Sequence, residues 1–365
     1  MLQAQEGHAM PTLLLDGTLT ALSPIAIILP GSEDNRTPAG PPRKRMLRDG
    51  VLVDTVYVPS SSLRGRLRHL LTGELMRLQN AADGRVFTPR DYIDTALGGV
   101  KDRKAPGDDE RKIDLKAIHA LRQRNPVVSL FGSMVAHVSG RLMVGDMTPE
   151  APIAPVGTGR SVRANPFVRN PAIIELLDPA RFEEFTRMND RRTEANRAED
   201  QAERLGKRLA GRKRAGAPAE EVAALAEEVA ALEQQAKAGF ADAGGAVNIQ
   251  QLLDGYETIP EGTTLTNRLR LLDGTDQEFA LLLLALDLLA RRPLIGGHTA
   301  QGCGEITGAW RLRWQDGASL RALGTLRIEP YAGVVLDTPD PMLDAAFARA
   351  RAFAEEVTSI DLRGA

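Results

Sequence analysis

The segment PSSSLRGRLR, residues 59–68, combines residue types that can bind an anion at the start of a helix. Its three serines stand where a helix N-cap is expected, and the N–H groups of a first helical turn have no partner within the helix. Two arginines one turn apart add positive charge, and Gly65 allows a ligand backbone to approach closely. The alternative is an ordinary capped surface helix with solvated arginines. The residues concerned are Ser60, Ser61, Ser62, Arg64 and Arg68.

A second candidate is the glycine-rich segment GGHTAQGCG, residues 296–304. Its glycines permit backbone conformations closed to other residues and a close approach to a phosphate or a base. The segment is not a Walker loop, because no Gly-Lys-Ser/Thr follows, and it is not a dinucleotide fingerprint, because it follows a helix and opens a strand. A tight structural turn is the alternative. The residues that would line a ligand groove are Gly296, Gly297, His298 and Gln301.

Positive charge gathers in the first quarter of the chain. The whole chain has 46 Lys and Arg against 48 Asp and Glu, a formal net charge of −2. Between residues 36 and 68, however, eight basic residues face only Asp49 and Asp54, which gives a local net charge of +6. Because residues 183–240 are rich in Glu, the neutral total hides a basic end that suits a polyanionic partner. The eight are Arg36, Arg43, Lys44, Arg45, Arg48, Arg64, Arg66 and Arg68.

Residue types for covalent or metal chemistry are scarce. A single cysteine excludes a disulfide framework and a cysteine-cluster zinc site, and the five histidines lack paired metal-ligand spacing, so no metal or cofactor is expected. Asp34, Asp49 and Asp54 could assist RNA cleavage, but a loop carboxylate beside arginines is more often an ion pair. An RNA-cleaving enzyme usually needs an acid–base pair near the scissile phosphate, for which only His69 or His298 could serve.

The composition indicates a folded chain that does not read bases by stacking. A hydrophobic content of 43% over 365 residues is enough for a core, whereas 4% aromatic residues argue against a surface of aromatic stacking platforms. The longest apolar run, Phe279–Ala290, contains Asp287 and is too short to span a membrane. With no targeting segment at its start, the chain is expected to be soluble and cytoplasmic.

Hydrophobic periodicity predicts the elements that hold these segments. Residues 30–42 and the basic stretch after them are expected to form a loop. Helices are expected at residues 61–79, 277–292 and 340–357. Strands are expected at residues 12–22, 51–58, 129–149 (two strands joined by a Ser-Gly turn), 258–274 and 325–336. A further strand is expected directly after the glycine-rich segment. The β-α-β … β-α-β order suggests an α+β fold with a ferredoxin-like (RRM-related) palm and large insertions.

Two insertions stand out between these elements. In residues 180–240 apolar residues recur at spacings of three and four, and AGAP breaks the pattern, which predicts an antiparallel helical hairpin. The Pro- and Gly-punctuated arm Ala151–Pro171 carries Arg160, Arg163 and Arg169. The expected parts are a palm at 12–177 and 245–336, the hairpin at 180–240, and a C-terminal helix and tail at 340–365.

Taken in order, five segments resemble the RAMP superfamily of CRISPR-associated proteins, and within it the Cas family-seven backbone subunits of effector complexes. The long hairpin and the basic first loop are most similar to the type IV backbone subunit. The five segments are LLLDGTLTALSPIAI, YVPSSSLRGRLRHLL, SLFGS with GRLMVGDMTP, TIPEGTTLTNRLRLL followed by a buried helix, and IGGHTAQGCGEITG.

The resemblance implies a palm, a protruding thumb, and several copies stacked along one guide RNA. The guide's phosphates would then contact the serines, Arg64 and Arg68 at the helix start, and the glycine-rich segment would line the same groove. The arm at residues 151–171 is the thumb candidate, with its three arginines on the nucleic acid. In type III relatives the first loop holds an aspartate that cleaves target RNA. In this chain the same loop holds Arg43, Lys44, Arg45 and Arg48, and Arg43 stands at about the position of that aspartate.

The function expected from this resemblance is binding of guide RNA without cleavage. The guide's bases would pair with a target DNA or RNA, so the protein would read only backbone and shape. Further copies of the chain and other Cas subunits are the expected protein partners, and no membrane is involved. The alternative is a RAMP-superfamily endoribonuclease that cuts target RNA or guide precursor.

Overall fold

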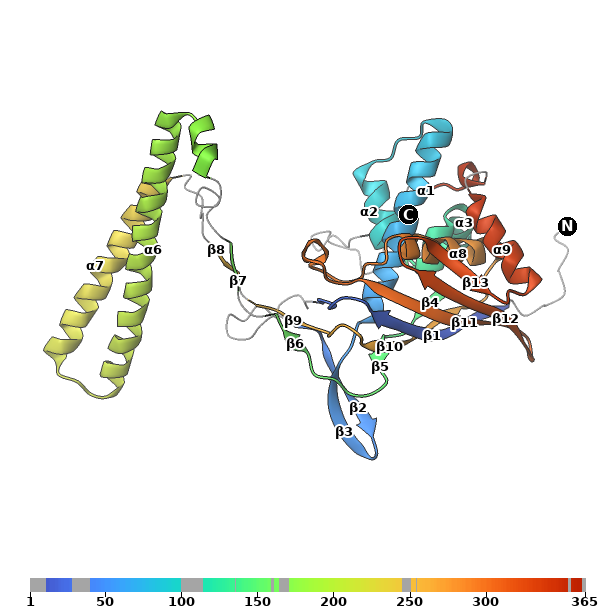
Figure 1. Cartoon of the computed structure of the whole chain (residues 1–365), viewed down its shortest axis with the longest axis horizontal. Coiled ribbons are helices and arrows are strands. Elements are labelled where there is room, and N and C mark those ends of the chain that lie inside the picture. Colours follow the sequence, from blue (N-terminus) through green and yellow to red (C-terminus); the bar gives the residue numbers. More distant parts are fainter. Residues whose placement is uncertain are drawn as a thin grey trace. The chain divides into compact units, whose positions relative to one another are not determined.

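The computed structural model divides the chain into two compact units, which are described separately. The first unit contains Met1–Thr158 and Tyr256–Ala365, and the second contains Gly159–Gly255. The model combines helices with antiparallel strands, so the expected α+β class is confirmed (Figure 1). The described residues are 11–27, 40–99, 114–134, 136–158, 161–163, 171–244, 251–253, 255–353 and 356–362.

The first unit is built on a seven-stranded antiparallel sheet. Its order is β13-β12-β11-β1-β10-β4, and β5 also pairs with β10. The strands are β1 (Thr12–Ala21), β4 (Leu142–Val144), β5 (Thr148–Pro149), β10 (Thr264–Leu271), β11 (Ile306–Asp316), β12 (Ser319–Glu329) and β13 (Gly333–Asp337).

The sheet has the ferredoxin-like arrangement. Helix α1 (Ser60–Asp83) connects β1 to β4, and helix α8 (Asp276–Arg291) connects β10 to β11. In space the strands of these two β-α-β units interleave as β11-β1-β10-β4, so each unit contributes one central and one outer strand. The β12–β13 hairpin extends the sheet beyond β11.

One face of the sheet carries the core. Alternate residues of β1, such as Leu13 and Leu15, are buried beneath α1 and α8, as the period of two in the sequence requires. Helix α1 places a leucine on this core at each turn, and burial of each stabilises the fold by about 1.5–3 kcal/mol. Helix α8 is buried nearly all round and starts with a capping box between Thr275 and Glu278. The α1 leucines are Leu63, Leu67, Leu71 and Leu75.

Four short helices and two single turns of 3-10 helix are the other helical elements described in this unit. They are α2 (Pro89–Leu97), α3 (Leu115–Arg124), α4 (Pro126–Phe131), α9 (Pro341–Arg351) with its following turn η5 (Val357–Ser359), and η3 (Thr299–Gln301). Among the described residues, no helix is both long enough and apolar enough to cross a membrane.

The basic stretch after residue 42 is a strand, so the expected loop is wrong at this point. Strand β2 (Arg43–Arg48) pairs with β3 (Val51–Val56) through a two-residue Asp49–Gly50 turn. Both turn residues have positive φ, 47° and 79°, which is the geometry that favours Asp-Gly in tight hairpins. The basic residues of Arg43–Arg48 therefore lie on a projecting two-stranded ribbon, formed by β2 and β3 (Figure 1).

Two further expectations about strands are wrong. The first expected strand in residues 129–149 is replaced at Ser129–Phe131 by the end of α4, because Asn125 accepts a hydrogen bond from the Val128 N–H at 3.1 Å and Pro126 opens the helix. Residues 325–336 contain a chain reversal instead of one strand. Tyr331, at φ 65°, lies in the turn between β12 and β13.

The second unit contains the long helical insertion. Helices α6 (Pro179–Arg214) and α7 (Ala219–Ala243) pack along each other, after a 3-10 turn η2 (Pro171–Leu176). Their contact is close because it uses small residues: a Cβ added at Gly239 would lie 2.9 Å from the Cβ of Ala195. Strands β7 (Ser161–Arg163) and β8 (Gln251–Leu253) pair within this unit, and β6 (Val156–Gly157) pairs with β9 (Glu257–Thr258) in the first unit.

Candidate nucleic-acid interface

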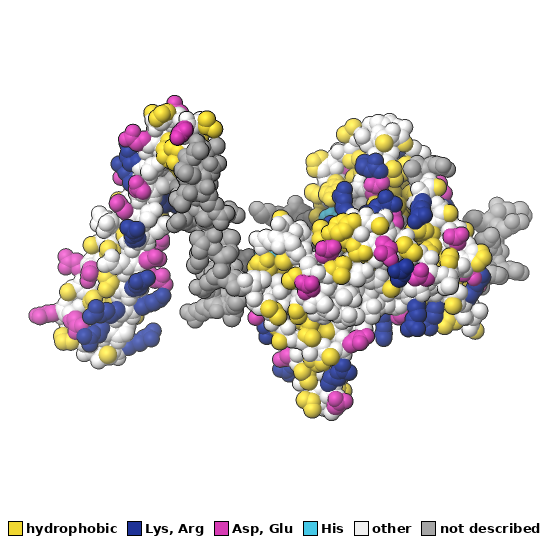
Figure 2. Space-filling view, viewed as in Figure 1, with side chains coloured by type: hydrophobic (Ala, Val, Ile, Leu, Met, Phe, Trp, Pro, Cys, Tyr) yellow, Lys and Arg dark blue, Asp and Glu magenta, His cyan; other side chains and the backbone are white. Residues whose placement is uncertain are grey.

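The sheet face opposite the helices carries exposed arginines. Arg268 on β10 and Arg311 on β11 both lie in register with Asp16 of β1, and all three belong to the less buried alternate positions of their strands. The Arg268 side chain is 79% exposed, and Arg313 is 43% exposed. In the view of Figure 2, Lys and Arg side chains follow the sheet's edge away from the helices. We call Arg268, Arg270, Arg311, Arg313 and Arg327 the sheet arginines.

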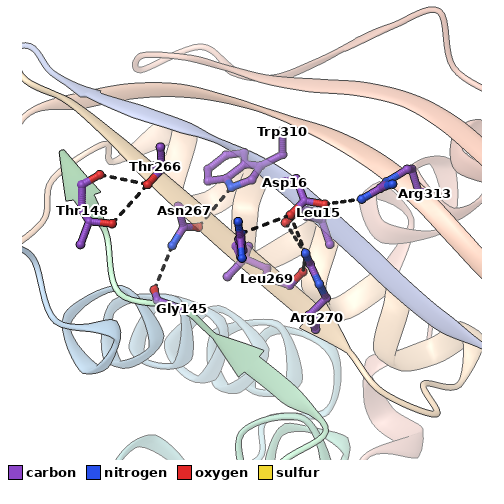
Figure 3. Close-up of polar contacts among 11 residues, drawn as sticks. Leu15, Asp16, Gly145, Thr148, Thr266, Asn267, Leu269, Arg270, Trp310 and Arg313 are labelled. Carbon is purple, nitrogen blue, oxygen red and sulfur yellow. Dashed lines mark hydrogen bonds and ion pairs between the residues drawn. The ribbon is translucent and has the colours of Figure 1, made fainter. Parts of the chain in front are cut away.

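Asp16 organises the centre of this face (Figure 3). One of its oxygens accepts a hydrogen bond from Arg270, and the other accepts one from Arg313 Nη2 at 2.7 Å. Partial burial alone would raise the pKa of the Asp16 carboxyl, but the hydrogen bonds and charges of the two arginines outweigh it, so the pKa lies below its ordinary value. Arg268 lies farther away, with Nε 3.8 Å from the carboxylate.

The sheet arginines therefore form two groups. In one the guanidinium is bonded to other groups of the sheet, and in the other it has no hydrogen-bonded carboxylate partner in the described part of the chain. Arg270 also donates to the backbone oxygens of Leu15 and Leu269, at 2.9 and 2.8 Å, which fixes its guanidinium against the sheet. Arg311 has no carboxylate within ion-pair distance among the described residues. Guanidinium groups in this free state can bind phosphate oxygens with paired N–H donors.

A polar network fixes the strands that carry these side chains (Figure 3). The Trp310 indole N–H donates to Asn267 Oδ1 at 3.2 Å, and the Asn267 amide donates to the Gly145 oxygen at 3.0 Å. These bonds cross β1 at Gly17, where an added Cβ would lie 1.9 Å from the Ala309 oxygen. A glycine at this position lets the buried indole reach the amide.

The serines at the start of α1 are in its first turn, so the expected N-cap role is wrong. The N-cap is Pro59, and no side chain caps the helix. The Ser60 N–H donates to Asp146 Oδ1 at 2.9 Å, and the other Asp146 oxygen lies 3.4 Å from Lys44 Nζ. A carboxylate of the chain itself therefore occupies one anion-binding position of this helix terminus.

A cavity of about 730 Å³ lies beside this first turn of α1. The cavity is lined by the end of α2, by the loop after α4, by strand β4, and by six residues of α1: Ser60, Ser61, Arg64, Gly65, Arg68 and His69. Arg64 donates to the backbone oxygen of Phe131, which points its guanidinium across the cavity. The structure thus brings together four of the expected residues; Ser62 is not among the lining residues.

Arg68 also borders this cavity, but its guanidinium is bonded to the chain itself. Its side chain is buried, with Nε donating to the Thr95 oxygen at 2.5 Å and Nη2 to the Asp94 oxygen at 3.4 Å. Burial, followed by the nearby charge of Arg64, lowers the pKa of Arg68 to about 10. Arg68 therefore joins α1 to α2. The sequence alone does not show that Arg68 differs from Arg64 in this way, because the hydrogen-bond partners of Arg68 belong to another helix.

The basic side chains of the β2–β3 ribbon are largely paired. Arg43 lies 2.9 Å from Glu257, and Arg45 lies 3.5 Å from Asp54. Lys44 contacts Asp146 and stands over the Tyr57 ring at 4.5 Å, and Arg48 donates to the Glu150 oxygen. The local net charge of +6 therefore overstates the free positive charge at this end, although Arg43 and Arg45 remain more than half exposed.

The glycine-rich segment is a tight turn fixed by its own backbone. A Cβ added at Gly296, which has φ 82°, would lie 2.4 Å from the Ala26 oxygen, and one at Gly304 would lie 2.2 Å from the Ile295 oxygen. These contacts support the structural alternative for the glycines. Gly297 pairs with Ala26 as an isolated β-bridge.

His298 and Gln301 of this segment gather around one aromatic residue. The His298 ring stacks on Tyr256 with centroids 4.0 Å apart and planes within 7°. The Tyr256 hydroxyl donates to Gln301 Oε1 at 2.8 Å. The described lining of the cavity beside α1 contains no residue of this segment, so the structure does not bring the two expected halves of the groove into one cavity.

Some expected residues lie outside the described residues. These are Asp34, Arg36, Arg160 and Arg169; Arg163 belongs to β7, but its side chain is not described. Among the described residues, no group of three or more His, Cys, Asp or Glu could hold a metal ion.

The sheet arginines are the residues that sequence reasoning missed. A signal for them exists, because NRLRL in β10 and WRLRW in β11 place arginines two residues apart. In a strand that spacing puts both on one face, while the leucines between them face the core.

Comparison with known proteins finds similarity among solved structures. No family model matches the chain, and no curated protein does. A solved structure titled "Type IV-B CRISPR Complex" contains a similar chain, with a TM-score of 0.42 and 16% sequence identity over 84% of this chain and 92% of that chain.

Proposed function

We propose that this chain is an RNA-binding subunit of a CRISPR effector complex, which stacks in several copies along a guide RNA and holds it for pairing with a target. The observation that carries the proposal is the row of sheet arginines on an uncovered face of a ferredoxin-like sheet. The ordered sequence segments that resemble the Cas family-seven subunits supply the family.

The chemistry of this face suits the phosphate backbone of a single strand. Exposed guanidinium groups on rigid strands bind phosphates without reading the sequence, and base recognition is left to pairing with the target. The cavity beside α1 offers a second group of contacts, with two serine side chains, Arg64 and the backbone at Gly65. Only 4% of residues are aromatic, which agrees with binding through the backbone.

We further propose that the subunit binds RNA without cutting it. A general base needs a pKa near the working pH, and the carboxyl group at the centre of the sheet face, Asp16, has a lowered pKa and two arginine partners. His298, the histidine of the glycine-rich segment, is stacked on Tyr256. These features favour a binding surface over a catalytic one.

The experiment uses purified protein and single-stranded RNAs of increasing length. Native mass spectrometry is expected to show more protein copies on longer RNAs, because head-to-tail stacking leaves each end open to another copy. End-labelled RNA recovered from the same mixtures is expected to be intact. A fixed stoichiometry would contradict stacking. Defined cleavage products that disappear in an Asp34→Ala or His298→Ala variant would support the endoribonuclease instead.

A further inference from the structure

We propose that the chain has a second anion site, which binds a phosphorylated nucleoside in a cavity between α1, α8 and α9. The cavity has a volume of about 990 Å³, at the upper end of the range typical of small-molecule sites. It lies in the helical layer, on the opposite side of the sheet from the sheet arginines, and so goes beyond the proposed binding of guide RNA. Five arginines line it: Arg66, Arg77, Arg291, Arg292 and Arg351.

The charges of this cavity do not cancel. Of its two lining carboxylates, Glu74 pairs with Arg77 at 2.5 Å, and Asp287 pairs with Arg291 at 2.9 Å. Asp287 also accepts the Val334 N–H at 2.9 Å, so it is already fully engaged. Among the described residues, the remaining three arginines have no carboxylate within ion-pair distance. We call Arg66, Arg292 and Arg351 the unpaired arginines.

Arg66 is the buried member of this group. Its Nη2 donates to the Arg292 backbone oxygen at 3.2 Å, and its Nε is buried without a hydrogen-bond partner. Burial, and then the charge of Arg292, lower the pKa of Arg66; burial, and then Arg68 and Arg66, lower the pKa of His69. A multiply charged anion beside these arginines would relieve this repulsion, and its charge-assisted hydrogen bonds would be strong in a partly buried site.

The rest of the lining suits a nucleoside. The His69 and Tyr92 rings stand together, with Nδ1 3.3 Å from the tyrosine hydroxyl and centroids 6.3 Å apart. Leu284, Leu288 and Phe353 add apolar surface. A cavity lined by apolar and aromatic side chains together with a group of arginines suits a molecule that combines a flat base with phosphates.

Isothermal titration calorimetry of the full chain tests this site with ATP, pyrophosphate and adenosine as probes. We expect ATP to bind, adenosine to give no measurable heat, and pyrophosphate to bind at least tenfold more weakly than ATP. An Arg292→Gln plus Arg351→Gln variant is expected to lose at least tenfold in ATP affinity. Arg349→Gln, on the same helix α9 but outside the cavity lining, is the matched control and should retain it. Thermal unfolding checks that the variants fold.

Competition with RNA separates the free nucleotide from an RNA strand as the source of the phosphates. If the nucleotide site is separate, a single-stranded RNA will not displace ATP, and an Arg268→Gln plus Arg311→Gln variant will bind ATP normally. Absence of ATP binding, or equal ATP binding by the Arg292 and Arg351 variant, overturns the proposal. Pyrophosphate binding as tight as ATP overturns the nucleoside assignment. Displacement of ATP by RNA overturns the separate site and assigns the cavity to the RNA path.

Discussion

The arginine side chains of this molecule have one of two roles: some join structural elements, and others are exposed and available to a ligand. Their hydrogen-bond partners determine the role. Arg68 and Arg270 donate hydrogen bonds to backbone oxygens and thereby join elements. Arg268 and Arg311 occupy exposed strand positions, and Arg268 keeps only a long contact of 3.8 Å from its Nε to Asp16. Only the second kind can contribute new phosphate contacts without breaking existing bonds.

Asp16 limits the positive potential of the sheet face. An Asp16→Asn substitution removes a negative charge between Arg270 and Arg313, so RNA affinity should rise several-fold and its salt dependence should steepen. The free energy of unfolding should fall by about 1 kcal/mol, because two charge-assisted hydrogen bonds are weakened. Fluorescence anisotropy with labelled RNA and urea unfolding measure the two effects; lower affinity would contradict the assignment of this face.

The same substitution has a defined pH dependence. The folded-state pKa of Asp16 is lowered, so the stabilisation from its carboxylate is fully present above the unfolded pKa of about 3.9 and is lost as the pH falls through the folded value. The difference in unfolding free energy between wild type and Asp16→Asn should therefore be constant near neutral pH and shrink below about pH 4. If this difference in unfolding free energy instead grows as the pH falls, the lowered pKa assigned to Asp16 is contradicted.

At the scale of elements, the sequence predicts best what depends on local periodicity. The leucine stripe of α1 and the apolar run of α8 identify both crossover helices, because their neighbours lie within one or two turns. Whether an individual arginine is buried or exposed, and which groups it contacts, is not predictable in this way. Arg64 and Arg68 lie one turn apart and both border the cavity beside α1, yet Arg64 reaches the loop after α4 while Arg68 is buried with its Nε bonded to α2. Partners from other elements decide that difference.

Gly65 distinguishes a binding role from a structural role for α1. No described atom lies within 4 Å of a Cβ added at Gly65, so Gly65→Ala should raise the free energy of unfolding by about 1 kcal/mol through helix propensity. If an RNA backbone approaches the helix there, the same methyl group should weaken RNA binding. Gly73→Ala, also open and on the same helix but outside this cavity, should stabilise equally without affecting binding. Equal binding by both variants would remove α1 from the interface.

At the scale of the whole molecule, the palm and the helical hairpin are separable by sequence composition. The Glu-rich segment with its spacing of three and four corresponds to α6 and α7, which pack on each other within their own unit. The order of strands in the sheet is less evident from sequence, because β1 pairs with β10 about 250 residues later. The order of β-α-β units in the sequence suggests a ferredoxin-like fold, but the residues that pair are visible only in the register of the strands.

The first unit should fold without the insertion. The chain leaves this unit at Thr158 and returns at Tyr256, and the Thr158 N–H donates to the Tyr256 oxygen at 2.8 Å, so a short Gly-Ser linker can replace residues 159–255. The shortened protein should keep a cooperative thermal transition within about 5 °C of the palm transition in the full chain. Loss of cooperative unfolding would show that the hairpin is part of the palm's core.

The most direct test of the central claim is the salt dependence of RNA binding. Affinity for two unrelated single-stranded RNAs is measured from low to high salt with wild type, with Arg268→Gln plus Arg311→Gln, and with Lys116→Gln on α3 as control. We predict similar affinities for both RNAs and a slope of log K against log salt that falls by about 1.4 in the double variant only, roughly 0.7 per lost phosphate contact. An unchanged slope in the double variant would contradict the sheet face as the RNA-binding surface.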